Sequence, residues 1–367
     1  MITVSLTNDM LKRITAIDEN RFSLKTIELP VTTKNRLRKN SKKKSSYASN
    51  KIEGNPLSEA QANEAVEKDE HKHFLKPEQE IRNYFLALTL LEEKLKIKEP
   101  FSMKLLLEVQ AMVEKGASKE KIGLRGEMPP GVLFAVYDSE TGTPEYIPPE
   151  YKDIPVLLEE LVDYVNTTDD HPLIVAAVVH YQLVTIHPFE DGNGRTARLI
   201  SGYILDLNGY GFNGIGSLEE YFAYDPDEYY SSLQMGLPAL YYSGRENPPH
   251  PEIWVNYFLR MVELYSNKVC EISKESTDNE LAGSLSYLNA KEKALLVYLI
   301  ENKILEFAPI DVAKKLGVTN KTIINRCIRL TNNGFLIPNI VKERVRSYSL
   351  SEFAKKNERQ IIAKITT

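Results

Sequence analysis

The chain has 367 residues, 42% of them hydrophobic and 26% charged, and its net charge is −5, a composition typical of a globular protein with room for two or three domains. No apolar run reaches the ~18–20 residues of a membrane-spanning helix, the first residues lack the layout of a signal peptide, and the two cysteines, Cys270 and Cys327, have no metal-ligand spacing. These features predict a cytoplasmic protein in a reducing compartment that makes no contact with a membrane.

The N-terminal part is predicted to be mainly helical. Residues 1–30 have the modest periodicity of one or two helices. Pro56 and Ser58 form a helix-start signal for the segment that follows them. At 77–97 and 101–115, apolar residues recur at i, i+3 and i+4, as in amphipathic helices. A basic, serine-rich stretch lies at 34–51. We expect its lysine run, Lys42–Lys44, to form a solvated loop.

The middle of the chain changes character at residues 126–149, GEMPPGVLFAVYDSETGTPEYIPP. Proline and glycine brackets and a Thr-Gly-Thr turn predict a β-hairpin there. Further helices are expected at 153–165, 172–187, 195–208, near 218–236 and at 251–274. The polar segment 273–284, SKESTDNELAGS, is predicted to be a linker.

The segment HPFEDGNGRTAR, residues 187–198, follows a helix so apolar on every side that it must be buried centrally. The next helix begins within this segment, and a helix N-terminus attracts anions through its unpaired N–H groups. Gly192 and Gly194 permit positive φ and a nest of N–H groups around Asn193. Arg195 and Arg198 share a helix face, and guanidinium groups match phosphate oxygens.

Two further side chains add chemistry to this predicted anion site. Asp191 supplies a hard oxygen ligand suited to a Mg²⁺ that keeps phosphate and water ligands. His187 is the group whose ordinary pKa lies nearest neutrality, which suits a general base. The alternative is an ordinary capped helix–loop–helix corner with surface charges, but the concentration of these groups within 12 residues favours a polyphosphate site.

This segment resembles the motif of the Fic family (filamentation induced by cAMP), His-x-Phe-x-Asp/Glu-Gly-Asn-Gly-Arg-x-x-Arg, at every defined position. The resemblance extends over roughly residues 30–270. It implies transfer of AMP from ATP to a Ser, Thr or Tyr hydroxyl of a protein, with release of pyrophosphate. The positions it implies for the ATP site are the base His187, the Mg²⁺ ligand Asp191, the anion-hole residues Gly192, Asn193 and Gly194, the phosphate ligands Arg195 and Arg198 (the latter for the γ-phosphate), their neighbours Thr196 and Ala197, and the core anchor Phe189.

The resemblance also assigns three accessory features. The hairpin would be a flap, placed at Leu133, Phe134 and Ala135, whose backbone pairs with the target segment. Tyr229 and Tyr230 resemble the tyrosines beside the nucleotide base, the alternative being two core tyrosines.

The third feature is SNKIEGN, residues 49–55, which matches the family's inhibitory pattern through Ser49, Glu53 and Gly54. The Glu53 carboxylate would pair with Arg198 and exclude the γ-phosphate. The alternative is an ordinary helix glutamate.

Two other histidines are interpreted as structural. His180 is expected to be a hydrogen-bonded core residue, and His171 is expected to start a helix.

Residues 289–367 hold 15 Lys and Arg against 7 Asp and Glu, a net charge of +8, while the remainder has −13. Helices at 310–316 and 320–332 followed by two strands resemble a winged helix-turn-helix, with Thr319 as a cap. Its basic and polar positions indicate contact with an anionic partner such as DNA; they are Asn320, Lys321, Thr322, Asn325, Arg326, Arg329, Lys342, Arg344 and Arg346. Such domains also bind proteins or dimerise.

The expected fold is therefore mainly α. It comprises an N-terminal helical region with the inhibitory motif (1–95), a Fic core with a small β-hairpin flap (96–272) and a winged helix-turn-helix domain (285–367). The expected function is an autoinhibited protein adenylyltransferase that uses Mg²⁺ and ATP, modifies a protein hydroxyl or itself, and forms a homodimer by family resemblance. The alternatives are a DNA-binding regulator with a nucleotide-sensing or dimerising core, and a Fic enzyme with another donor, such as UTP or a phosphocholine carrier.

Overall fold

The computed structural model describes residues 2–68, 73–117, 122–132, 134–137, 142–237, 248–341 and 343–366. The chain divides into two compact units, one made of Met1–Arg21 and Arg36–Val269 and the other of Phe22–Asn35 and Cys270–Thr367. Within the described ranges, no helix is long and apolar enough to cross a membrane.

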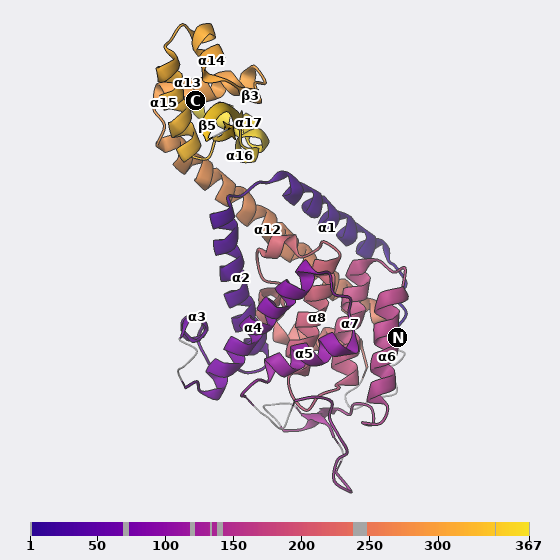
Figure 1. The fold of residues 1–367 in the computed structure, drawn as a ribbon. Helices are drawn as coiled ribbons and strands as arrows, with labels where there is room; N and C mark the ends of the chain where they lie inside the picture. Colours follow the sequence, from indigo (N-terminus) through magenta and orange to yellow (C-terminus); the bar gives the residue numbers. More distant parts are fainter. Residues whose placement is uncertain are drawn as a thin grey trace. The chain divides into compact units, whose positions relative to one another are not determined.

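The first unit is built almost entirely of helices, as predicted (Figure 1). Its helices, some of which continue into the second unit, are α1 (Asn8–Thr26), α2 (Val31–Ile52), α3 (Glu59–Glu67), α4 (Lys76–Lys96), α5 (Met103–Val113), α6 (Ile154–Thr167), α7 (Pro172–Ile186), α8 (Asn193–Leu207), α9 (Glu219–Tyr224), α10 (Pro226–Gln234) and α12 (Pro251–Ser286), with a 3₁₀ turn, η1, at Phe212–Gly214.

Helix α7 forms the centre of this unit, because it is buried on nearly every side, as its sequence predicts. It packs against α8 and α6, while α4 and α5 pack against α8 from another side. Helices α7 and α8 are joined by only six residues. The end of α7 and the start of α8 therefore lie close together, with the loop between them partly exposed at Glu190 and Asp191.

The predicted hairpin is present but small. Strands β1 (Val136–Tyr137) and β2 (Pro144–Tyr146) pair antiparallel, with a register irregularity between Val136 and Tyr137. Phe134 and Ala135 precede β1, whereas Leu133 lies outside the described residues.

Two predictions for the first unit were wrong. The lysine run Lys42–Lys44 lies within helix α2 and is not a loop. The serines of this helix form its buried face, and two of them, Ser41 and Ser46, donate to the backbone carbonyl four residues earlier. The helix expected near 218–236 is divided into α9 and α10, because Pro226 cannot continue a helix from the preceding turn.

The second unit combines helices with a three-stranded antiparallel sheet of order β3-β5-β4. The elements are α13 (Ala290–Glu301), β3 (Glu306–Phe307), α14 (Pro309–Leu316), α15 (Asn320–Asn332), β4 (Leu336–Val341) and β5 (Arg344–Leu350), followed by α16 (Glu352–Lys356) and α17 (Glu358–Thr366). Thr319 caps α15 by accepting from the Thr322 N–H, as predicted. The interpretation as a winged helix-turn-helix stays a prediction.

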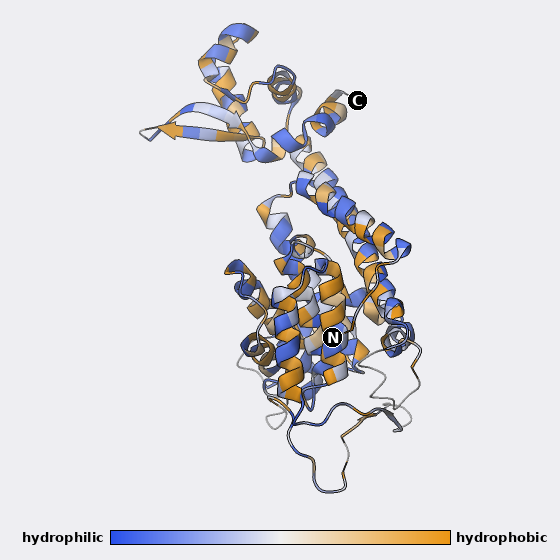
Figure 2. Cartoon of the chain, turned by 90° about the vertical axis from the view of Figure 1, so that its right-hand side faces the viewer, coloured by the Kyte–Doolittle hydropathy of each residue, from blue (hydrophilic) through white to orange (hydrophobic). Residues whose placement is uncertain are grey.

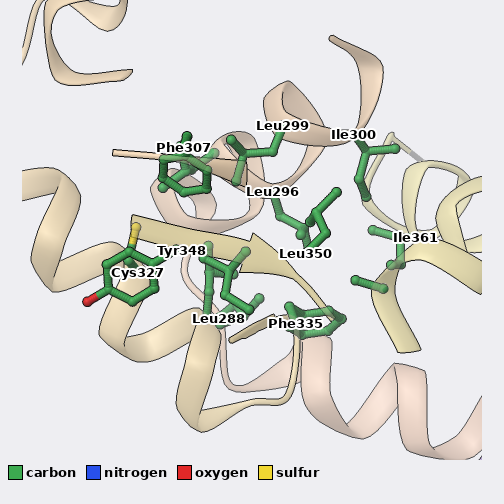
Figure 3. Close-up of a cluster of buried hydrophobic side chains, with 14 of the residues drawn as sticks. Leu288, Leu296, Leu299, Ile300, Phe307, Cys327, Phe335, Tyr348, Leu350 and Ile361 are labelled. Carbon is green, nitrogen blue, oxygen red and sulfur yellow. The ribbon is translucent and has the colours of Figure 1, made fainter. Parts of the chain in front are cut away.

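A single apolar cluster holds this unit together. Figure 3 shows Leu296, Leu299 and Phe335 among the buried side chains around strand β5. The predicted linker at 273–284 was wrong, since α12 runs through it to Ser286.

Candidate active site

His187 is placed by the end of the buried helix α7. It caps the helix in a left-handed conformation (φ 47°, ψ 59°), and its N–H donates to the Leu183 carbonyl at 3.1 Å. A left-handed non-glycine residue is uncommon, and such strain is typical of functional positions. Arg125 fixes the turn, because its Nε donates to the His187 carbonyl at 2.8 Å.

The His187 imidazole is arranged as a neutral base. Its Nδ1 lies 3.3 Å from the Val184 carbonyl, which can only accept, so Nδ1 carries the proton and Nε2 is the basic nitrogen. Burial lowers the pKa of His187 to about 4. The ring of Phe134, one of the predicted flap residues, lies 6.0 Å from that of His187.

The loop between the helices is fixed by Asn193. Its side chain accepts from the Phe189 N–H at 3.0 Å and donates to the Phe189 carbonyl at 2.9 Å. Phe189 is buried, as predicted for an anchor. Gly192 adopts φ 78°, a conformation that favours glycine. Asn193 therefore shapes the anion-binding loop, and its amide group is engaged by the loop backbone.

Helix α8 begins at Asn193, two residues before the predicted start. The first turn of α8 continues directly from the loop. The N–H groups that a helix leaves unpaired at its N-terminus therefore lie at this loop, where they can bind an anion. Thr196 and Ala197, predicted near ATP, have side chains buried in the packing of α8.

Arg195 lies between two carboxylates. Its Nη2 is 3.0 Å from Glu114 Oε1 and 3.1 Å from Asp191 Oδ1. Glu114 caps the C-terminal end of α5 and is buried. The guanidinium predicted to bind phosphate is thus already paired with acidic groups in this structure.

Arg198 lies among residues of the predicted inhibitory motif. Its Nε donates to Ser49 Oγ at 2.8 Å, and its Nη2 donates to the Ser49 carbonyl at 2.9 Å and to Glu53 Oε1 at 2.7 Å. The Arg198 side chain is 1% exposed and that of Glu53 33%. Burial acts to lower the pKa of Arg198, but the charge of the neighbouring Glu53 carboxylate outweighs it and raises the pKa above its ordinary value, so the guanidinium remains charged.

Glu53 also lies against the anion loop. A Cβ placed on Gly194 would clash with the Glu53 carboxylate, so this carboxylate touches the backbone that the sequence assigns to phosphate. Gly54 adopts φ 78° just after α2 and ends the helix, which sets the direction in which Glu53 projects. A carboxylate at a helix C-terminus is disfavoured by the helix dipole, and pairing with Arg198 offsets this.

The two predicted nucleotide-base tyrosines have different surroundings. The Tyr229 hydroxyl is buried, 2.8 Å from His180 Nε2 and 3.5 Å from Arg198 Nη1. Tyr230 is 44% exposed, and its hydroxyl donates to the Ile52 carbonyl at 3.4 Å. His180 is a hydrogen-bonded core residue and His171 caps α7, both as predicted.

The structure adds residues that no sequence motif indicates. Glu114, Gln110 and Arg125 come from outside the motif and hold its loop. The Gln110 amide lies 3.4 Å from the Asp191 carbonyl and accepts from the Gly123 N–H. The sequence of the 187–198 segment cannot indicate these partners, because they lie far from it in the chain and only the fold brings them next to it.

Asp191 is the residue here that suits a metal. Its carboxylate is 30% exposed beside the loop, and a hard oxygen donor with open surface fits a Mg²⁺ whose remaining ligands are phosphate and water. No group of three or more His, Cys, Asp or Glu side chains that could hold a metal exists among the described residues. The donors present therefore fit a cation carried with a polyphosphate, and not a cation held in a closed protein cage.

The geometry alone describes a helical protein whose site combines an anion-binding loop, a neutral histidine base and two buried arginines, Arg195 and Arg198. Comparison with known proteins names the family. Residues 100–205 match the model of the Fic/DOC family. The sequence is 29% identical over 211 residues to the protein adenylyltransferase Fic of Drosophila mojavensis, covering 54% of this chain and 38% of that protein. The chain thus spans about two fifths of the length of the curated relatives it matches.

Solved structures agree on the fold. A Fic family protein from Desulfovibrio desulfuricans G20 covers 96% of this chain and 98% of its own, with a TM-score of 0.59 and 19% identity. Fic-1 (residues 134–508) from C. elegans covers 73% of this chain and 72% of its own, with a TM-score of 0.55 and 25% identity. The predicted resemblance is confirmed: residues 100–205 match the Fic/DOC family model, and the fold is that of solved Fic family proteins.

Proposed function

We propose that the chain is a protein adenylyltransferase that transfers AMP from ATP to a protein hydroxyl. The observation that carries the proposal is the meeting of a neutral His187 with the loop of Gly192, Asn193 and Gly194 at the start of a helix. Relatives covering about half of the chain are named protein adenylyltransferases, which supports the nature of the transferred group.

His187 Nε2 takes the proton of the incoming hydroxyl while the hydroxyl oxygen attacks the α-phosphorus. The bond between the α-phosphorus and the oxygen that bridges to the β-phosphate breaks, and pyrophosphate leaves. The helix N-terminus and Arg198 stabilise the phosphate charges that change during transfer. A Mg²⁺ held by Asp191 would neutralise charge on the α- and β-phosphates. Positioning and electrostatics provide most of the catalysis in this kind of chemistry.

We propose that the form described here is inhibited. Glu53 takes the guanidinium that a γ-phosphate would need, and it brings a negative charge to the anion loop. Like charges repel strongly in a partly buried site. ATP would then bind without its γ-phosphate in place, and transfer would be slow until α2 or Glu53 moves.

The test is AMP transfer by the Glu53→Gly chain, with Mg²⁺ and ATP labelled at the α-phosphate, alone and with cell proteins. Label is expected on a partner protein or on the chain itself, and it should vanish in Glu53→Gly/His187→Ala. The matched control is Glu53→Gly/His250→Ala, since His250 is an exposed histidine paired only with Glu252 in the described structure. Full labelling without His187 would overturn the proposal.

A second function, DNA binding by the C-terminal unit, is supported by one group of exposed residues. Lys321 and Asn325 lie one turn apart and exposed on α15, and Arg344 and Arg346 are exposed on β5. Figure 2 shows hydrophobic residues next to hydrophilic ones along the β4–β5 hairpin. Arg329 does not belong to this group, because its Nε pairs with buried Glu292 at 3.0 Å. Lys342 lies outside the described residues.

DNA binding is tested by fluorescence anisotropy with duplex DNA over a range of salt concentrations. Binding should weaken with salt by a slope of roughly 0.9 per phosphate contact. It should fall in Lys321→Ala/Arg344→Ala and not in Lys291→Ala, an exposed lysine on α13. Absence of binding at low salt would instead favour a protein-binding role for this unit.

A further inference from the structure

The buried carboxylate of Glu114 has no role in the transfer reaction described so far. It belongs to the C-terminal end of α5, 81 residues before Arg195, and is 1% exposed. Its Oε1 lies 3.0 Å from Arg195 Nη2. A Cβ on Gly192 would lie 2.7 Å from the same oxygen, so the carboxylate packs directly against the anion loop.

One guanidinium nitrogen serves both Glu114 and Asp191. Arg195 Nη2 is 3.1 Å from Asp191 Oδ1, nearly the same distance as to Glu114. The Nε and Nη1 atoms of Arg195 are buried and have no hydrogen-bond partner among the described residues. Arg195 therefore does not form the two-pronged pair with Asp191 that an arginine makes with a single carboxylate.

The charges show what Glu114 contributes. Glu114, Arg195 and Asp191 together carry a net charge of −1, and the Arg195 charge is divided between two acids. Without the Glu114 charge the group would be neutral, and Asp191 would be the one acid among the described residues paired with Arg195. A carboxylate fully engaged by arginine is a poor ligand for a divalent cation, because the cation would have to displace a charge-assisted pair.

We propose that Glu114 is a positioning residue that draws Arg195 away from Asp191 and so preserves Asp191 as the ligand of the divalent cation that accompanies ATP. This inference rests on the proposed function for the identity of the nucleotide. Partners of this kind, one step removed from the metal, typically alter metal affinity by about 10- to 100-fold when they are changed.

The probe is Mn²⁺ with a non-transferable ATP analogue, followed by electron paramagnetic resonance, in the Glu53→Gly chain. Glu114→Gln keeps the shape of the side chain and removes its charge. It is expected to raise the Kd for Mn²⁺ about tenfold, while the affinity for the analogue in the presence of EDTA stays the same. Thermal unfolding of each variant reports whether it folds.

A second substitution separates charge balance from structure. In Glu114→Gln/Arg195→Gln the Arg195 charge is absent and can no longer compete with the cation for Asp191, so Mn²⁺ affinity should recover toward that of the parent. Should Glu114→Gln fail to fold, Arg195→Gln alone provides the test, and it is expected to bind Mn²⁺ at least as tightly as the parent. Unchanged Mn²⁺ affinity in folded Glu114→Gln, or weaker affinity in Arg195→Gln, would overturn the inference.

Failure of this inference differs from failure of the proposed function. The Mn²⁺ measurement does not depend on AMP transfer. A Glu53→Gly chain that binds Mn²⁺ and the analogue but transfers nothing would contradict the function and leave the role of Glu114 standing.

Discussion

Removing the Glu53 charge without changing the shape of the side chain tests how the inhibitory contact acts. In Glu53→Gln the amide oxygen can still accept from Arg198, but the charge that opposes the γ-phosphate is gone. The contact is a 2.7 Å charge-assisted bond between an arginine that is 1% exposed and a glutamate whose side chain is 33% exposed. Such bonds contribute about 1.5–3 kcal/mol, and the solvent exposure of Glu53 favours the lower half of that range.

The magnitude follows from that energy. A contribution of about 1.5–2 kcal/mol corresponds to a roughly 10- to 30-fold change in an equilibrium constant. Because the γ-phosphate can reach Arg198 only when the contact is broken, the apparent affinity for ATP bound with its γ-phosphate in place should rise by about that factor. Isothermal titration calorimetry with a non-transferable ATP analogue and Mg²⁺ measures it directly.

The matched control is Glu64→Gln, an exposed glutamate on α3, which should bind the analogue as the parent does. Both Glu53→Gly and Glu53→Gln are expected to bind the analogue more tightly than the parent. Equal affinities for Glu53→Gln and the parent would refute the electrostatic reasoning and leave only steric exclusion by the helix.

Four further experiments have defined outcomes. Burial lowers the pKa of His187 to about 4. The rate of AMP transfer by Glu53→Gly should therefore stay constant from about pH 8 to about pH 5.5 and decline only as the pH approaches the pKa of His187. This folded-state pKa lies below the ordinary 6.5, so the stability that neutral His187 contributes is fully present above pH 6.5 and is lost as the pH falls toward 4. In denaturant titrations, the free energy of unfolding should therefore fall less between pH 6.5 and pH 4 in His187→Ala than in the parent. Lys42 on α2 pairs with Glu92 at 2.9 Å on the surface, so Lys42→Ala should loosen α2 by about 0.5–1 kcal/mol and raise transfer roughly 2- to 5-fold in the otherwise wild-type chain, an effect that added salt should mimic. Phe335 is fully buried in the C-terminal core (Figure 3), so Phe335→Ala should lower the free energy of unfolding of that unit by about 3–5 kcal/mol in a denaturant titration.

Much of the site was predictable because its chemistry lies within short segments. The segment 187–198 contains the end of one helix, the loop and the start of the next, so the side chains it brings together are neighbours in sequence. The burial of α7 was predictable as well, because a helix that is apolar all round has no face for water. The pairing of Glu53 with Arg198 joins residues 145 apart, and only the family pattern indicated it.

The remaining features depend on packing that local composition does not encode. Glu114 is a single acid at the end of a helix, and its partners become neighbours only when α5 packs against α8. The segment 273–284 appears polar, yet Ser273, Thr277 and Leu281 recur every fourth residue and are all buried on one face of α12. Small polar residues that hydrogen-bond to the backbone can line a buried face, which a hydrophobicity pattern misses.

The measurement that tests the central claim most directly compares two labels on the same nucleotide. The Glu53→Gly chain is incubated with Mg²⁺ and with ATP labelled at either the α- or the γ-phosphate, and the labelled proteins are separated from free nucleotide. Adenylyl transfer predicts protein label from the α-phosphate alone, with the γ-label recovered in pyrophosphate. Protein label from the γ-phosphate would show a kinase reaction and contradict the account.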